Sequence, residues 1–147
     1  MTNIKTKPNI RRRFFAGFID YSIIFTSQLL LIIFLGTPDE QGEYHLTGLI
    51  CLVPILFWGI MTIGLELAFG ATVGNLIVGL EPIPINGTSN EIRFSQSFKR
   101  HFLDIIDMFF FGLVAYITIK NTEKNQRLGD IWAKTIVVNK NELKLIQ

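Results

Sequence analysis

Four carboxylates lie inside long apolar stretches of this sequence, where an ionisable side chain is energetically costly. The stretches cover residues 14–35, 46–69 and 102–119. The carboxylates are Asp20 in the first, Glu66 in the second, and Asp104 and Asp107 in the third. Such a group can pair with a cation and hold helices together, or it can carry a proton along an ion path. The residues leave both roles open, together with binding of a ligand or a lipid headgroup by nearby cations.

Helical spacing places these carboxylates near cations and small side chains. Two sets recur at intervals of three and four residues, and each set therefore shares one helix face: Arg13, Gly17 and Asp20, and Arg100, Asp104 and Asp107. With a rise of about 1.5 Å per residue, all four carboxylates lie within about 10 Å of the polar ends of their stretches. We therefore expect them to meet near one surface of the membrane.

Asp20 requires a partner from outside its own helix, because about 10 Å of helix separates it from Arg13. The partner is expected in another segment, a backbone group or water, with Arg100 and Arg127 as the candidate side chains. We expect Asp20 to be structural and the other three carboxylates to be better candidates for carrying a proton.

The composition is that of a membrane protein with a single domain. The chain has 147 residues, of which 49% are hydrophobic, with 13 Phe and a mean hydropathy of +0.39. A soluble domain of this size needs more polar cover than that. The net charge of only +2 gives no support for a nucleic-acid partner. We expect the domain to occupy residues 1–147, with its core at 10–139.

The first two stretches, 14–35 and 46–69, are each long enough to cross a hydrocarbon core of about 30 Å. The loop at 36–45 contains no Lys or Arg, whereas five precede the first stretch. Cytoplasmic loops are richer in Lys and Arg, so the N-terminus is predicted in the cytoplasm and this loop outside. Residues 14–35 are predicted to be an uncleaved anchor, because they are too long for a signal peptide and no cleavage site follows.

The third stretch, 102–119, is either a third span or a re-entrant hairpin that turns at Gly112. Six basic residues follow it, and a full span would place all of them outside. This favours the hairpin. The predicted fold is therefore an all-α integral membrane protein with two transmembrane helices and a third apolar segment.

A small cytoplasmic β-hairpin or sheet is expected beside these helices. Asn86-Gly87 lies between apolar residues at 80–85 and 92–94, which indicates a hairpin turn. The β-branched segment 135–138 is predicted to be a strand that pairs with 79–85. The sequence shows no internal repeat.

Other chemistry has little support, and we expect no enzymatic activity, no cofactor and no metal. His101, Asp104 and Asp107 offer types of side chain that bind metals, but a lone His beside Arg100 is more typical of an interface. Residues 70–75 lack the Gly-Lys-Ser/Thr of a phosphate-binding loop. No Ser or Cys has a credible basic partner.

Three motifs in this order resemble those of the RDD family of membrane proteins. They are Arg13-Phe14-Phe15-Ala16-Gly17-Phe18-Ile19-Asp20, Gly70-Ala71-Thr72-Val73-Gly74-Asn75, and Arg127-Leu128-Gly129-Asp130. Arg100 stands where the family often has an arginine. Two positions depart from the family pattern. Asn75 stands where the family usually has a lysine, and Gly129 stands where it commonly has a histidine.

The resemblance implies a multi-pass protein of the bacterial plasma membrane, in a family for which cation–proton exchange has been proposed. The expected site comprises Arg13, Asp20, Glu66, Arg100, Asp104, Asp107, Arg127 and Asp130, with Gly17, Gly70 and Gly74 as packing glycines. The expected function is transport of small cations or protons. The alternative is a non-catalytic module that binds partner proteins or lipids. Two spans and a hairpin enclose no wide pathway, so a homo-oligomer or a membrane partner protein is expected within the lipid bilayer.

The distribution of Lys and Arg predicts that both termini lie in the cytoplasm. A compartment-sensitive reporter fused after Gln147 should therefore give a cytoplasmic signal. A signal from outside the cell would instead show three full spans.

Overall fold

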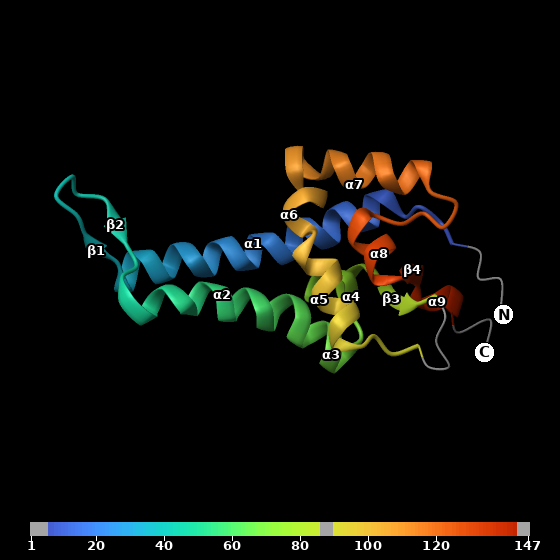
Figure 1. Ribbon diagram of the computed structural model, residues 1–147, viewed down its shortest axis with the longest axis horizontal. Helices are drawn as coiled ribbons and strands as arrows, with labels where there is room; N and C mark the ends of the chain where they lie inside the picture. Colours follow the sequence, from blue (N-terminus) through green and yellow to red (C-terminus); the bar gives the residue numbers. More distant parts are fainter. Residues whose placement is uncertain (1–5, 86–89, 144–147) are drawn as a thin grey trace.

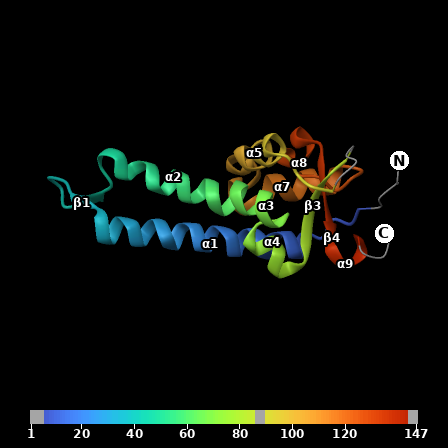
Figure 2. The same ribbon diagram turned by 90° about the horizontal axis from the view of Figure 1, so that it is seen from below.

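Two long helices lie side by side along the longest axis of the molecule in the computed structural model, which describes residues 6–85 and 90–143 (Figures 1 and 2). The first is α1, Ile10–Leu35. The second comprises η1 (Gly48–Cys51), α2 (Leu52–Gly59), the π-helical turn η2 (Ile60–Gly64) and α3 (Leu65–Phe69). Both are long and apolar enough to cross a membrane. Helix α2 buries none of its side chains, which leaves its apolar surface for lipid.

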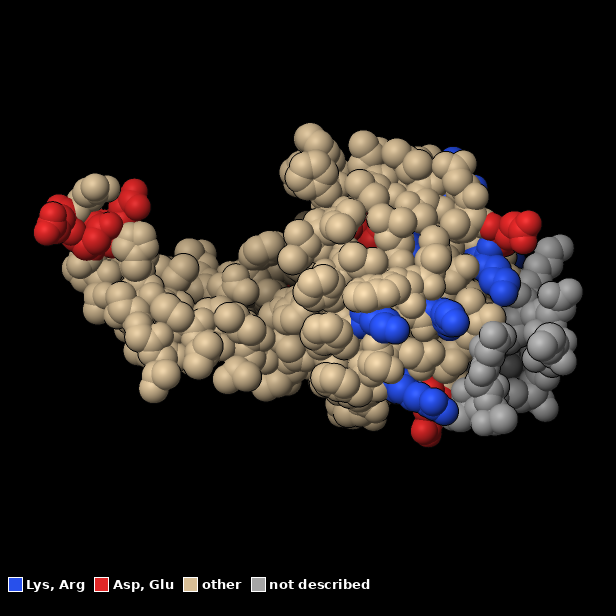
Figure 3. All heavy atoms as spheres, in the orientation of Figure 1, with Lys and Arg blue, Asp and Glu red and all other residues tan. Residues whose placement is uncertain are grey.

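The two ends of the molecule differ in charge. The strands β1 (Thr37–Pro38) and β2 (Tyr44–His45) form an antiparallel ribbon that connects the long helices. Figure 3 shows acidic side chains gathered at this ribbon, which we call the acidic end of the molecule. Most of the visible basic side chains lie at the opposite end, which we call the basic end, and an uncharged surface separates the two. Helix α1 begins at the basic end, and α9 (Lys140–Leu143) lies there too (Figure 1). The start of α1 and helix α9 thus lie at the same end of the molecule, as the predicted topology requires. That this end faces the cytoplasm stays a prediction.

The third apolar segment is bent rather than straight. Residues 102–119 cover the end of α5 (Phe94–Phe102), all of α6 (Asp104–Asp107) and most of α7 (Phe109–Asn121), and an angle of 115° separates the helices before Met108 from α7. Positive φ angles at residues 110–112 reverse the backbone, and the predicted turn at Gly112 is therefore present. Helices α5 and α6 run across the long axis, whereas α7 runs along it (Figure 1). The bent pair fits either a broken third span or a re-entrant hairpin, and the re-entrant hairpin stays a prediction.

A small sheet lies at the basic end and confirms one predicted strand pair. The strands β3 (Leu80–Pro84) and β4 (Thr135–Asn139) are antiparallel, with Pro82 opposite Val137. Ile83, Ile136 and Val138 form its buried apolar core. The expected hairpin is wrong in part, because residues 91–93 form no strand and Phe94 begins a helix; the Asn86-Gly87 turn lies outside the described residues. Prolines limit the hydrogen bonds that β3 can make, which suits a strand with one neighbour.

The structure also contains a backbone repeat that the sequence does not show. Helix α4 (Val73–Val78), one left-handed residue and β3 recur 55 positions later as α8 (Leu128–Ala133), one left-handed residue and β4. The left-handed residues are Gly79 and Lys134, with φ angles of 71° and 55°. Pro82 and Val137 are also 55 positions apart and face each other, so an approximate two-fold axis passes through that pair.

Each short helix of the repeat begins against the backbone of an earlier helix. A Cβ atom at Gly74 would overlap main-chain atoms of Ala16 in α1, and one at Gly129 would lie 2.5 Å from the carbonyl oxygen of Arg100 in α5. Only glycine allows such close approach of two backbones. The glycines therefore set the distance at which α4 and α8 pack.

Gly74→Ala should lower the stability of the folded protein by about 1–3 kcal/mol, because the added methyl group has only rigid backbone to displace. Thermal unfolding in detergent, followed by loss of the monodisperse peak, would measure this. Gly59→Ala is the matched control: a Cβ atom there meets nothing within 4 Å, and alanine suits a helix at least as well as glycine. Equal effects of the two substitutions would contradict the packing role of Gly74.

Candidate functional site

The charged residues expected from the sequence form one buried cluster at the junction of the long helices with the basic end. Glu66, Arg100 and Asp107 are almost fully buried, and Arg13 and Arg127 are nearly so. They come from α1, α3, α5, α6 and the start of α8. Segments far apart in the sequence therefore meet through their charges.

Asp130 lies at the centre of the ion pairs. Its carboxylate is 3.0 Å from Arg13 Nη1, 3.3 Å from Arg100 Nε and 3.6 Å from Arg127 Nε, and the residue is 0% exposed. Burial alone would raise the pKa of this carboxyl, but the three arginines outweigh burial and hold the pKa below its ordinary value. Asp130 is therefore a permanent anion that joins α1, α5 and α8.

Arg127 is the second point where several charges converge. Its Nη1 lies 2.5 Å from Asp104 Oδ1, and its Nε lies 3.9 Å from Asp107 Oδ2. Burial would lower the pKa of the guanidinium, but the charges of Asp104, Asp130 and Asp107 raise it above its ordinary value. Arg127 therefore remains charged and connects α8 to α6.

His101 bridges two carboxylates, a role that the sequence reasoning missed. Its Nδ1 lies 2.8 Å from Asp104 Oδ2, and its Nε2 lies 3.2 Å from Glu66 Oε2. Tyr21 extends the chain by donating its hydroxyl to Asp104 Oδ2 at 3.2 Å. An imidazole donates from both nitrogens only when it is protonated. The available signal was spacing, because His101 is three residues before Asp104 and shares its helix face.

Asp20 contacts neither of its expected arginine partners. It accepts hydrogen bonds from Thr72 Oγ1 and the backbone N–H of Gly74, both at 2.7 Å. The reason is local: the first N–H groups of a helix have no partner within it, and Asp20 supplies one for α4. The prediction of Arg100 or Arg127 was therefore wrong, and the expectation of a backbone group was correct.

Asp107 has the same role for α8. It accepts hydrogen bonds from the backbone N–H groups of Leu128 at 3.1 Å and Gly129 at 3.0 Å. Main-chain atoms of Arg100 lie too close to Gly129 for a histidine, or any other side chain, to fit at this position of the structure. In both copies of the repeat, backbone N–H groups at the start of the short helix therefore donate hydrogen bonds to a carboxylate of an earlier helix.

The three packing glycines serve different purposes. Gly74 gives α4 its close approach to α1, as described above. Gly70 ends α3 with φ 79°, in the left-handed region that glycine adopts without strain. Gly17 faces the flexible end of Met108, where an added Cβ would lie 2.7 Å from the methyl carbon.

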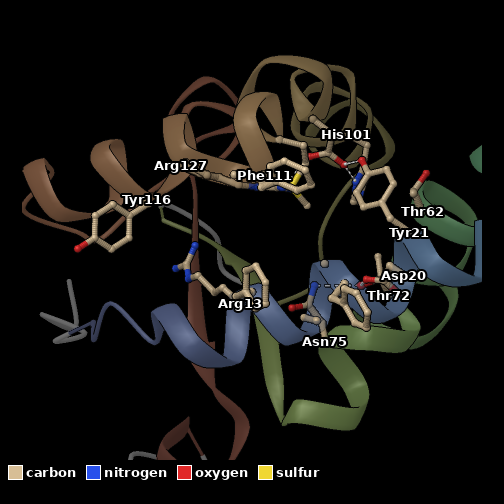
Figure 4. Close-up of a pocket in the computed structure, with 18 of the residues that line it drawn as sticks. Arg13, Asp20, Tyr21, Thr62, Thr72, Asn75, His101, Phe111, Tyr116 and Arg127 are labelled. Atoms are coloured by element: carbon tan, nitrogen blue, oxygen red, sulfur yellow. Dashed lines mark hydrogen bonds and ion pairs between the residues drawn. The ribbon is translucent and has the colours of Figure 1, made fainter.

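A cavity of about 1150 Å³ opens between α1 and the α5–α7 segment. Figure 4 shows Asp20, Thr72 and Asn75 on one wall, and Tyr21 and His101 nearby. Apolar side chains form much of the remaining lining, and the cavity side of the kink carries the exposed Phe111. The cavity thus combines a polar wall with an apolar rim.

The charges of the buried cluster, taken together with Asp20 on the cavity wall, do not balance among the described residues. Five buried carboxylates face three guanidinium groups, which leaves a formal charge of −2 when His101 is neutral and −1 when it is protonated; the carboxylates are Asp20, Glu66, Asp104, Asp107 and Asp130. A proton or a cation can reduce this excess.

Asp130→Asn should lower the free energy of unfolding by about 3–5 kcal/mol, because three buried arginines would lose their shared counter-charge. Thermal unfolding in detergent measures the loss, and Glu123→Gln, at an exposed position after α7, is the control.

The pH dependence follows from the lowered pKa of Asp130. The native carboxylate contributes stability above its unfolded pKa of about 3.9, and this contribution disappears as the pH falls through the lower native value. The difference between wild type and Asp130→Asn should therefore be constant from pH 5 to 8 and shrink below about pH 4. A difference that changes between pH 5 and 8 would contradict the permanent charge.

Comparisons with known proteins agree with this arrangement of motifs. The profile of the RDD family matches residues 7–134, which include all three motifs and the whole charged cluster. No curated protein and no solved structure matched the chain. The match covers most of the chain, and the protein therefore belongs to the RDD family.

Proposed function

We propose that this protein exchanges small cations for protons across the bacterial plasma membrane, without enzymatic chemistry and with its N-terminus in the cytoplasm. The observation that carries the proposal is the hydrogen-bonded chain Glu66–His101–Asp104–Tyr21. Histidine between two carboxylates is suited to passing a proton, because each ring nitrogen has an acceptor in place. The chain lies beside the cavity, where a transported ion has access to it.

Electrostatic competition couples the proton to the cation in this proposal. A proton on His101 and a monovalent cation in the cavity each reduce the same negative excess by one charge. Asp20, Thr72 and Asn75 offer oxygen atoms on the cavity wall, the ligand type that hard cations prefer. Binding of one species therefore weakens binding of the other, which is the requirement for exchange.

The route through the rest of the membrane requires a second copy or a membrane partner protein. Towards the acidic end, α1 and α2 continue as a pair, and the buried residues of α1 all lie in its first 15 positions. A second copy packed along these helices would enclose the missing half of the path.

The alternative is a membrane module that binds partner proteins or lipids and moves no ion. The ion pairs of Asp130 and the helix caps of Asp20 and Asp107 support it, because these carboxylates already have structural partners. Flux of ions by the purified protein distinguishes the two functions.

The test uses proteoliposomes with a pH-sensitive dye inside and a Na⁺ or K⁺ gradient across the membrane. Wild-type protein should couple cation movement to a change of internal pH. His101→Asn should reduce this coupling to the level of empty liposomes while folding normally, since an amide does not titrate in this range.

His45→Asn is the matched control, because His45 is exposed on the β1–β2 ribbon and should leave flux unchanged. Undiminished flux in His101→Asn would reject the proposed proton path. Absence of flux in the wild type would favour the binding module.

A further inference from the structure

A row of four aromatic rings lies on the outer surface of the basic end. The aromatic row consists of Phe94, Phe98 and Phe102 of α5 and Trp132 of α8. Successive ring centroids are 6.2, 5.7 and 6.1 Å apart. The four side chains are 63%, 41%, 52% and 46% exposed. Four contiguous exposed rings are more than the scattered apolar residues that any surface carries.

Helix α5 is amphipathic, but its polar face is buried and its apolar face is exposed. A surface helix of a soluble protein has the reverse arrangement. Its polar residues Ser97, Arg100 and His101 are buried towards the charged cluster. Its phenylalanines face outward at intervals of four residues. This arrangement is stable where the outside is apolar and the interior provides ion pairs, as it is beside a bilayer.

The orientation of α5 places the aromatic row at the edge of the bilayer rather than at its centre. Figures 1 and 2 show α5 running across the axis of α1 and α2, so it lies parallel to a membrane that these helices cross. It lies close to the level at which α3 ends and α4 begins. Helices with this orientation and composition occupy the boundary between headgroups and acyl chains, where tryptophan is also enriched.

Basic side chains accompany the row. Lys99 Nζ lies 5.6 Å from the centroid of the Trp132 ring. Arg93 precedes Phe94, Lys134 follows Trp132 by two residues, and both are exposed. No acidic residue occurs in α5, and the one in α8, Asp130, is fully buried. The exposed charges within α5 and α8, and at Arg93 and Lys134 that flank them, are therefore all positive.

We propose that the aromatic row and Lys99 form a binding surface for anionic phospholipids of the adjacent leaflet. The rings pack against the glycerol region and the upper acyl chains, and Lys99 binds the headgroup phosphate. Arg93 at the start of α5 and Lys134 at the end of α8 add positive charge. Aromatic rings that hold a lysine at their face keep its charge at the level of the phosphates. This inference is independent of ion transport.

The test uses Trp132 as the reporter of its own depth. The chain has two tryptophans, and Trp58→Phe leaves Trp132 alone. The variant is reconstituted in vesicles of phosphatidylcholine that carry bromine at a shallow or a deep acyl position. Shallow bromines should quench the fluorescence of Trp132 most. Stronger quenching of Trp132 by deep bromines would overturn the proposal. Quenching by aqueous iodide but not by brominated lipid would overturn it as well.

The headgroup preference is measured in the same single-tryptophan protein. Shallow-brominated phosphatidylglycerol should quench at a lower mole fraction than shallow-brominated phosphatidylcholine. Lys99→Gln should lower this preference by about fivefold, the effect of one basic residue near an anionic surface.

Lys120→Gln is the matched control, because Lys120 also lies over an aromatic ring, that of Tyr116 at 4.9 Å, but outside the row. It should leave the preference unchanged. Equal losses in both variants would show general charge attraction instead of a site. Protection of Trp132 from both brominated lipid and iodide would show that protein covers the row, and would reject lipid as its partner.

Discussion

The ion pairs of buried Asp130 are the interaction on which the rest of this structure depends. One carboxylate holds arginines from α1, from α5 and from the residue before α8. Asp130 is fully buried, so its carboxylate is stabilised by these arginines and not by bulk water. The positions of Arg13, Arg100 and Arg127 are thereby coupled, and the helices that carry them assemble around one point.

The short helices of the repeat are anchored to this frame by polar contacts with earlier helices. Neither α4 nor α8 is long enough to be stable alone. Asp20 and Asp107 supply acceptors for their first N–H groups, and Gly74 and Gly129 allow close packing. The strands that follow pair with each other, and the two copies therefore support one another across the sheet.

The part of the cluster around His101 has no such structural role and is therefore free for proton chemistry. Asp130, Asp20 and Asp107 have firm structural partners, whereas His101 stands between two carboxylates beside the cavity. Protonating it changes the charge of the site without removing an arginine counter-charge. The same helix α5 that buries His101 presents its aromatic row to the outside, so the proposed proton path and the lipid surface are opposite faces of one element.

The amino-acid sequence by itself determined the candidate spans, the charged residues of the site and the strand at 135–138, because apolar length, isolated charges and β-branched runs are local properties of the chain. The pairing of this strand with 79–85 followed from the need of both segments for backbone partners. Only the tertiary structure decided that Asp20 caps α4, that His101 bridges Glu66 and Asp104, and that α4–β3 recurs as α8–β4. These contacts join segments up to 54 residues apart, and a repeat of backbone shape requires no repeat of side chains. Local periodicity carries no information about which helix end a carboxylate will meet, since that depends on how all the charges are neutralised together.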